Sequence, residues 1–218
     1  MTSIELFAGA GGLALGLEQA GFEHIGLVEF NRDAADTLIA NRPQWKVLCE
    51  DIAQVAERDL EEEFGIRKFD LDLLSGGAPC QSFSYAGKRL GLQDVRGTMF
   101  YHYATFLHKL QPKMFLFENV RGLLTHDGGR TYKTILDIFE DEGYTTVHKV
   151  LNAWDYGVPQ KRERVFIVGF RADVHAAGLQ PGAVPAGLPR RRQLHQHHHS
   201  SDDLLRRHHR LRTEVRQE

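Results

Sequence analysis

The chain contains only two cysteines, Cys49 and Cys80, among its 218 residues. Cysteines this few and this far apart favour a reducing compartment over a disulfide framework, and they exclude a cysteine-rich zinc site. The sequence also lacks any run of about 18 apolar residues that could form a membrane span. Its first residues lack the basic, apolar and cleavage regions of a signal peptide. These absences predict a cytoplasmic protein.

The chain has little net charge, −2 at pH 7, but the charge is unevenly distributed. Residues 176–218 hold eight Arg against four acidic residues, whereas the remainder holds 19 Lys and Arg against 25 Asp and Glu. An acidic body does not hold a polyanion over a broad face by charge alone. If the partner is a nucleic acid, we expect a focused cleft, or help from residues or a subunit outside residues 1–175.

Residues 176–218 contain no Phe, Trp or Tyr, although they hold six of the twelve His and three of the seven Pro. A segment of this composition can bury little apolar surface. We therefore expect two parts. Residues 1–175 are long enough for one domain with a single core, and residues 176–218 form a basic, His- and Pro-rich tail that is disordered or a short helix.

The apolar pattern of residues 1–171 alternates strands with helices. Strand-like runs lie at 2–7, 25–29, 47–49, 71–75, 114–117, 145–151 and 164–170, and helical spacing at 13–20, 31–41, 98–110 and 131–142. This order predicts an α/β fold with a mostly parallel sheet between helices. The last two strands have no long helix between them, which predicts an antiparallel hairpin at one edge of the sheet.

A glycine-rich turn at residues 8–12 separates the first strand from the first helix. Glycines let the backbone approach a ligand, and a helix N-terminus offers unpaired amides, so the arrangement is typical of nucleotide sites. By itself the turn equally fits an ordinary α/β unit without a ligand. Glu29 and Asp51 end the next two strands, where carboxylates can contact a ribose and an adenine. Their positions favour the nucleotide interpretation.

Cys80 ends the loop that follows the fourth strand. A lone cysteine is more often a buried structural residue. Here Pro79 on one side and the polar Gln81 and Ser82 on the other argue against burial. A positive neighbour would be needed to make Cys80 a thiolate near pH 7.

Two charged segments accompany the fifth and the last strand. Glu118 ends a wholly apolar strand, where desolvation would raise its pKa and make it a proton donor. The commoner fate of such a residue is a helix cap or an ion pair. The run QKRER at residues 160–164 precedes the last strand; such runs are usually solvated surface, but this one is expected to face the same way as Cys80 and Glu118.

Together and in this order, these segments resemble the cytosine-5 DNA methyltransferase family of bacterial restriction-modification systems across residues 3–171. The matching segments are Phe7–Gly16, Glu29, Asp51-Ile52, Pro79-Cys80-Gln81, Arg96-Gly97-Thr98, Glu118-Asn119-Val120, residues 152–159 and QKRER at 160–164. The resemblance implies a Rossmann-like class I S-adenosylmethionine-dependent methyltransferase fold. It also implies S-adenosylmethionine as methyl donor, double-stranded DNA as partner and no metal.

The resemblance further implies catalytic roles. Cys80 is expected to attack C6 of a cytosine flipped out of the duplex. Glu118 would hold and protonate N3 of the base, while Arg164 would contact O2 and help position Glu118, with Arg162 nearby. The methyl group would then pass to C5, and loss of the C5 proton would free Cys80.

The remaining matching residues are expected to bind the two substrates. Gln81 and Ser84 would lie on a loop that closes over DNA. The expected cofactor contacts are Phe7, Gly9, Gly11, Leu13, Glu29, Phe30, Asp51, Ile52, Pro79 and Met99.

Residues 172–218 do not show the target-recognition region and the two final motifs with which the family continues. Three interpretations stay open: the catalytic subunit of a split enzyme, a truncated or frameshifted product with little activity, and a self-sufficient enzyme with a minimal reader. The third is disfavoured because a specific DNA interface buries about 1,000 Å² or more.

Two further classes are also considered. A tRNA cytosine-5 methyltransferase shares this core. A nicotinamide-dependent oxidoreductase shares only the first βαβ unit and does not call for Cys80, Glu118 and Arg164 together.

Overall fold

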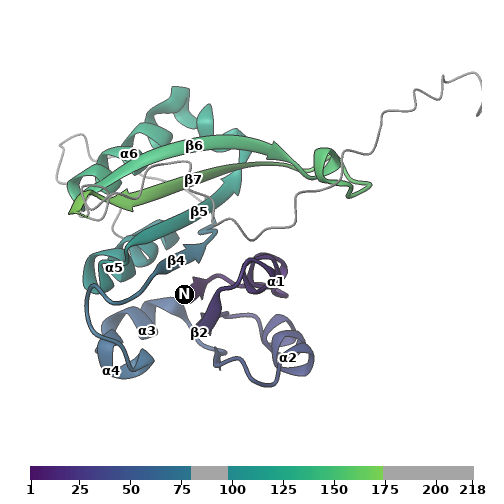
Figure 1. The fold of residues 1–218 in the computed structure, drawn as a ribbon. Helices are drawn as coiled ribbons and strands as arrows, with labels where there is room; N and C mark the ends of the chain where they lie inside the picture. The colour runs from purple at the N-terminus through teal and green to yellow at the C-terminus, as the bar shows by residue number, and fades with distance from the viewer. Residues whose placement is uncertain (80–97, 174–218) are drawn as a thin grey trace, which may run out of the picture. The chain divides into compact units, whose positions relative to one another are not determined.

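The structure, a computed structural model, describes residues 1–79 and 98–173 (Figure 1). Its strands are β1 (Thr2–Leu6), β2 (Glu23–Val28), β3 (Val47–Leu48), β4 (Leu73–Gly76), β5 (Met114–Val120), β6 (Tyr144–Asn152) and β7 (Glu163–Arg171). Its α-helices are α1 (Gly12–Gln19), α2 (Arg32–Asn41), α3 (Ile52–Glu57), α4 (Leu60–Phe64), α5 (Met99–Leu110) and α6 (Arg130–Asp141). Short 3-10 turns are η2 (Arg121–Leu124), η3 (His126–Gly129) and η4 (Ala153–Tyr156).

The strands form one sheet in the order β3-β2-β1-β4-β5-β7-β6. The first five strands in that order pair in parallel, and β7 pairs antiparallel with both β5 and β6. The predicted α/β class, the mostly parallel sheet and the antiparallel edge hairpin are thus confirmed. The parallel order brings the carboxyl ends of β1 to β5 to one edge, where ligands of such sheets bind.

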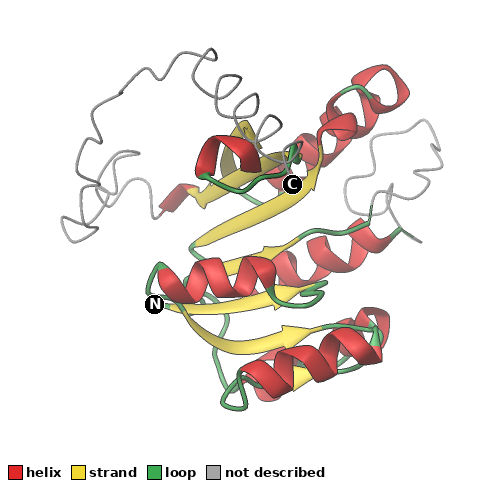
Figure 2. Ribbon diagram, turned by 90° about the vertical axis from the view of Figure 1, so that its right-hand side faces the viewer, coloured by secondary structure: helices red, strands yellow, loops and turns green. Residues whose placement is uncertain are grey.

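Helices cover both faces of the sheet. Figure 1 shows α1 and α2 on one side of the strands and α3 to α5 on the other, and Figure 2 is viewed from the side of α1 and α2. A small apolar cluster joins Ala14 of α1 and Leu38 of α2 to the sheet. A larger cluster joins the sheet to α3, α4, α5 and α6. The helices packed on both faces therefore hold the ends of the strands in position.

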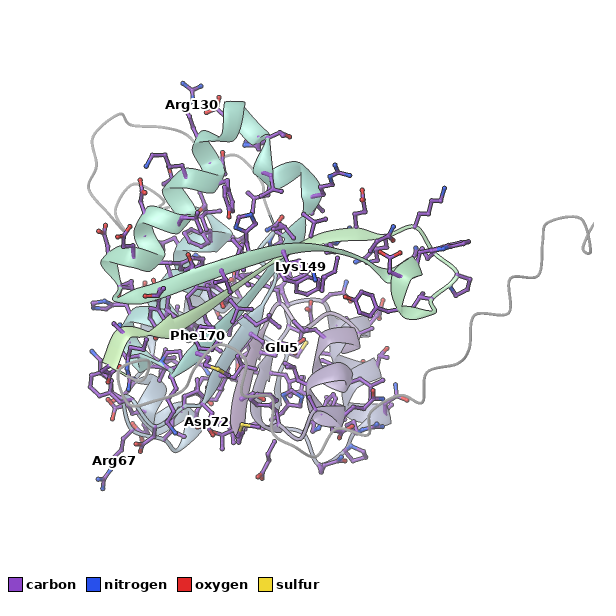
Figure 3. The ribbon with its side chains drawn as sticks, turned by 45° about the horizontal axis from the view of Figure 1, so that its top comes forward. Glu5, Arg67, Asp72, Arg130, Lys149 and Phe170 are labelled. Carbon is purple, nitrogen blue, oxygen red and sulfur yellow. The ribbon has the colours of Figure 1, made fainter. Side chains whose placement is uncertain are left out.

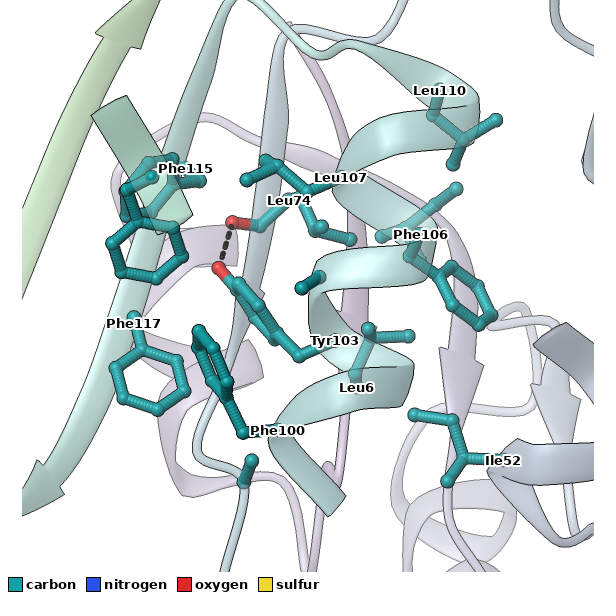
Figure 4. Close-up of a cluster of buried hydrophobic side chains, with 14 of the residues drawn as sticks. Leu6, Ile52, Leu74, Phe100, Tyr103, Phe106, Leu107, Leu110, Phe115 and Phe117 are labelled. Atoms are coloured by element: carbon teal, nitrogen blue, oxygen red, sulfur yellow. Dashed lines mark hydrogen bonds between the residues drawn. The ribbon is translucent and has the colours of Figure 1, made fainter. Parts of the chain in front are cut away.

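The largest fully buried side chains of the larger cluster are aromatic, and Figure 4 shows several of them. Tyr103 of α5 is fully buried, and its hydroxyl lies 3.3 Å from the carbonyl oxygens of both Leu74 in β4 and Leu116 in β5. The rings of Phe115 and Phe139 lie 4.2 Å apart. Burying each such ring stabilises the fold by about 1.5–3 kcal/mol. This packing fixes β4 and β5, the strands that lead to Pro79 and Glu118.

Local signals explain most element boundaries. Asn31 caps α2 by accepting a hydrogen bond from Ala34 N. Thr98 caps α5 in the same way through Tyr101 N. The helices α3 and α4 were not predicted, because they have only six and five residues and too little length to show a periodic pattern. Their start is set by the aspartate caps Asp51 and Asp59.

One predicted boundary was wrong in a way that matters for the site. The apolar run predicts a fifth strand that stops at Phe117, with Glu118 at its end. In the structure β5 continues to Val120, because its last residues pair with β7 as far as Val120↔Arg164. Glu118 is therefore held inside a strand.

Among the described residues, no helix is both long and apolar enough to cross a membrane. Residues 176–218 fall outside the described ranges, so the division of the chain at residue 175 stays a prediction.

Candidate active site

Two neighbouring cavities lie at the carboxyl ends of the parallel strands. The first, here the acidic cavity, has a volume of about 470 Å³ and is lined by Phe7, Val28, Glu29, Phe30, Glu50, Asp51, Ile52, Gly77, Pro79 and Met99. The second, here the arginine cavity, has a volume of about 530 Å³ and is lined by Glu5, Phe7, Ala8, Gly12, Leu13, Gly76, Gly77, Glu118, Leu151, Ala153, Tyr156, Arg162, Arg164 and Phe166. Phe7 and Gly77 line both cavities, so the two share a wall.

The backbone holds the carboxylate of Glu29 in place at the acidic cavity. Its two oxygens accept hydrogen bonds of 2.7 Å from the amides of Gly9 and Asn31. Asp51 accepts a hydrogen bond of 2.9 Å from Ala53 N and so caps α3. It also lines the acidic cavity, so the same carboxylate can be both a helix cap and a ligand contact. With Glu50, which pairs with Arg58, three carboxylates line this cavity beside the exposed ring of Phe30, and they suit a ligand with hydroxyl groups and a flat, uncharged ring.

Phe7 adopts a backbone conformation that side chains usually avoid. Its φ is 57°, in the left-handed region, which costs about 1–3 kcal/mol in a residue other than glycine. The surrounding packing must stabilise this unfavourable conformation. The conformation turns the chain from β1 into the glycine turn. The ring belongs to the shared wall.

The predicted cofactor residues fall into three groups. Seven of them line the acidic cavity: Phe7, Glu29, Phe30, Asp51, Ile52, Pro79 and Met99. Leu13 lines the arginine cavity instead. Gly9 contributes its amide to Glu29, and Gly11 has a φ of 88° and no room for a Cβ beside Leu38. The two glycines therefore shape the turn.

Glu118 and Arg164 form an ion pair in the arginine cavity. Arg164 Nε lies 3.0 Å from Glu118 Oε1, and the two side chains are 23% and 25% exposed, in the order Arg164, Glu118. The pair follows from the register, since Arg164 lies opposite Val120 and reaches diagonally to Glu118 on the same face. Glu118 thus forms an ion pair, one of the two contacts that are common for an acid at this position.

Asn119 and Gly77 link Glu118 to the loop that leads to Cys80. The buried Asn119 donates a hydrogen bond of 2.9 Å from Nδ2 to the carbonyl of Ala78. A Cβ on Gly77 would lie 2.8 Å from Glu118 Oε2. Any Cβ here would force the Glu118 carboxylate to shift, so β5 and the loop after β4 are built as one unit.

Glu5 is a candidate that the sequence analysis missed. It is 1% exposed and lies in the interior of the fold (Figure 3). Burial raises its pKa from 4.5 to about 8, although hydrogen bonds from Ser75 and from the backbone of Ala14 oppose the shift. A Glu within the apolar run of β1 was the signal available in the sequence. Glu5 also lines the arginine cavity.

The hydrogen bond from Ala14 places the Glu5 carboxyl at the N-terminus of α1. In dinucleotide folds this position receives the pyrophosphate, because the first amides of the helix are unpaired. Here an internal carboxyl already takes one of those amides. The amide that a pyrophosphate would use is therefore occupied, which disfavours a dinucleotide at this helix start.

Three predicted residues, Cys80, Gln81 and Ser84, lie outside the described ranges. Cys80 directly follows Pro79, which lines the acidic cavity. Cys49 is half-buried just after β3. The structure therefore brings together Glu118, Arg162 and Arg164 of the four predicted catalytic residues.

The chain is similar to known proteins in two comparisons, one with a family model and one with individual proteins. Residues 1–215 match the family described as C-5 cytosine-specific DNA methylases. The type II methyltransferase M.Sau96I of Staphylococcus aureus is 54% identical over 170 residues, which are 78% of this chain and 39% of the relative. M.Eco47II of Escherichia coli is 51% identical over 174 residues, 79% of this chain and 40% of the relative.

Solved structures support the fold. A DNA modification methyltransferase encoded in an Escherichia coli prophage superposes with a TM-score of 0.66 at 28% identity, covering 80% of this chain and 48% of that one. The DNMT2 of Spodoptera frugiperda superposes with a TM-score of 0.60 at 22% identity, covering 78% of this chain and 50% of that one, and shows the fold alone. The chain thus spans half or less of the length of each of these proteins.

Proposed function

Because the chain belongs to the C-5 cytosine-specific DNA methylase family, we propose that it is the catalytic part of a DNA (cytosine-5)-methyltransferase. The observation that carries the proposal is the pair Glu118–Arg164, held in one cavity that shares a wall with an acidic cavity. This geometry provides one site for a base and an adjoining site for a nucleoside-type donor. An acid with a purely structural role would not need a second, acidic cavity beside it.

The acidic cavity is the proposed site of S-adenosylmethionine. Glu29 suits the ribose hydroxyls, Asp51 the amino group of the adenine, and Phe7 and Phe30 its ring faces. The Glu5 carboxyl at the start of α1 takes an amide that a pyrophosphate would need, which argues against a dinucleotide and weakens the oxidoreductase alternative. When bound, S-adenosylmethionine supplies a methyl group on a positively charged sulfur. No metal is proposed, because this chemistry does not call for one.

The arginine cavity is the proposed site of the flipped-out cytosine. Cys80 is the proposed nucleophile, and its sulfur forms a bond to C6. A proton from the Glu118 carboxyl to N3 neutralises the charge that this attack would leave on the ring. Arg164 holds that carboxyl and offers guanidinium donors to O2, and Arg162 adds a second positive charge. C5 then accepts the methyl group, and its proton leaves to a base. The bond from C6 to sulfur breaks with its electron pair returning to Cys80, and N3 gives its proton back to Glu118.

Duplex DNA is the proposed substrate, in preference to tRNA. The matching family is described as DNA methylases, and the relatives at 54% and 51% identity are named type II methyltransferases. We expect the enzyme to serve a restriction-modification system and to act in the bacterial cytoplasm, where that DNA lies. Methylation of tRNA but not of duplex DNA would contradict this choice.

We also propose that this chain needs the part of the relatives that it does not match. It spans 39% and 40% of the two type II relatives, so more than half of their length has no counterpart here. A second polypeptide with a target-recognition region would supply that part in a split enzyme. The alternatives are a truncated product with little activity and a self-sufficient enzyme.

Trapping on 5-fluorocytosine DNA tests the function. Fluorine at C5 cannot leave as a proton does, so the covalent adduct accumulates. We expect an adduct with the wild-type chain, combined with the unmatched part of the Staphylococcus aureus relative if needed, and none with Cys80→Ser. Cys49→Ser is the matched control and should form the adduct. An adduct that survives Cys80→Ser, or that maps to Cys49, contradicts the proposal.

A further inference from the structure

The tip of the β6–β7 hairpin, residues 152–162, exposes large apolar side chains. Figure 1 shows the hairpin running past the ends of the other strands and closing in the η4 turn. Trp154 is 57% exposed, Tyr156 60% and Val158 47%. Single exposed apolar residues are ordinary, but three within five residues on a projecting turn are typical of a contact surface.

The tip is also built as a rigid turn. Asn152 Oδ1 accepts hydrogen bonds from Trp154 N at 3.2 Å and from Arg162 N at 3.1 Å, which ties the two sides of the turn together. Val158 N donates to the carbonyl of Ala153 at 3.3 Å. A surface fixed before binding loses little conformational entropy when it docks.

The apolar stretch of the tip, residues 153–158, carries one acidic side chain, Asp155, and no basic one, whereas Lys161 and Arg162 follow at the end of the tip. A surface that contacts the DNA backbone needs Lys or Arg, since phosphate contacts provide most of the affinity. Arg162 lines the arginine cavity, and the apolar stretch 153–158 with its Asp instead fits a polypeptide that offers an apolar pocket with a polar rim.

We propose that the hairpin tip is the docking element for the half of the family sequence that this chain does not match. The proposal rests on the proposed function. Its further support is that the tip continues into the site: Ala153, Tyr156 and Arg162 line the arginine cavity, so a partner seated on Trp154 and Val158 would reach the mouth of that cavity. Docking there would couple assembly of the two halves to completion of the base site.

Co-expression tests the proposal. The tagged 218-residue chain is produced together with the unmatched part of the Staphylococcus aureus relative, and the co-purified complement is quantified. The variant Trp154→Ser/Val158→Ser should recover about tenfold less complement or worse, because central aromatic contacts dominate interfaces. The matched control is Ile39→Ser/Val147→Ser, whose side chains are 45% and 56% exposed on α2 and β6. It should recover as much as the wild type.

Several outcomes overturn the docking proposal. They are equal recovery with the tip variant, no recovery with the wild type, or an equal loss with the control. A dimer of the chain alone, or DNA binding by the chain alone, that the tip variant abolishes would instead assign the tip to a second copy or to DNA. Binding of S-adenosylmethionine by each chain alone, measured in parallel, separates this failure from failure of the proposed function, since neither Trp154 nor Val158 lines the acidic cavity.

Discussion

Replacing Glu5 by Gln should flatten the dependence of stability on pH. The wild-type carboxyl is 1% exposed and has a pKa of about 8, against 4.5 for a free Glu. Gln has nearly the same shape, keeps an acceptor for the bonds from Ser75 and Ala14, and is neutral at every pH. The substitution therefore removes one ionisation and little packing.

The sign follows from proton binding. Between pH 4.5 and about 8 the folded protein holds a proton on Glu5 that the unfolded chain releases. The free energy of unfolding then falls as pH rises, by up to about 1.4 kcal/mol per pH unit. The favourable contribution is complete below pH 4.5 and lost as pH rises through about 8. From pH 5 to pH 8 the stability of Glu5→Gln relative to the wild type should rise by about 3 kcal/mol.

Urea unfolding at pH 5, 6, 7 and 8, followed by tryptophan fluorescence, measures this difference. Glu61→Gln is the control, because Glu61 is an exposed carboxyl on α4 and its removal should leave the wild-type slope unchanged. Equal slopes for wild type and Glu5→Gln would refute the reasoning. So would a constant loss of stability in the variant at every pH, which would mean that Glu5 acts as a hydrogen-bonded anion throughout.

Two further predictions concern the shared wall and the acidic cavity. Gly77→Ala should displace the Glu118 carboxylate, which would lie 2.8 Å from the new Cβ. Methyl transfer should fall by about tenfold to a hundredfold, with a smaller change in cofactor affinity. A radioactive methyl-transfer assay with the complemented enzyme checks this, and an unchanged rate would contradict it. Glu29→Ala should weaken S-adenosylmethionine binding by about 1–3 kcal/mol, because it removes the carboxylate and the hydrogen bonds that position the amides of Gly9 and Asn31. Calorimetry with the purified chain measures this affinity, and unchanged tight binding would remove Glu29 from the cofactor site.

Much of the site was predictable because its residues sit at chain positions with strong local signals. Strand-end acids such as Glu29 and Asp51 can be read from the sequence, since apolar runs define the strands and parallel strands end at one edge. The QKRER run was likewise placed just before the last strand; Arg162 lies there, and Arg164 is the second residue of β7. Cys80 depends on the resemblance alone, because it lies outside the described residues.

Other features depended on pairing between segments far apart in the chain. The true end of β5, and with it the setting of Glu118, is decided by the antiparallel register with β7, which no local pattern encodes. The same register brings Arg164 within 3.0 Å of Glu118. Burial of Glu5 requires β2 and β4 on either side of β1 and α1 across its face, so its pKa follows from packing.

The sequence by itself determined the alternation of strands and helices, the glycine turn and the order of reactive residues, because periodicity and turn chemistry are local properties. Only the tertiary structure decided that the acidic and arginine cavities share Phe7 and Gly77 as a wall. It likewise decided that a carboxyl occupies the start of α1 and that the apolar hairpin tip stands free of the sheet. Each of these depends on which distant segments become neighbours, and that is set by the register and packing of the whole sheet.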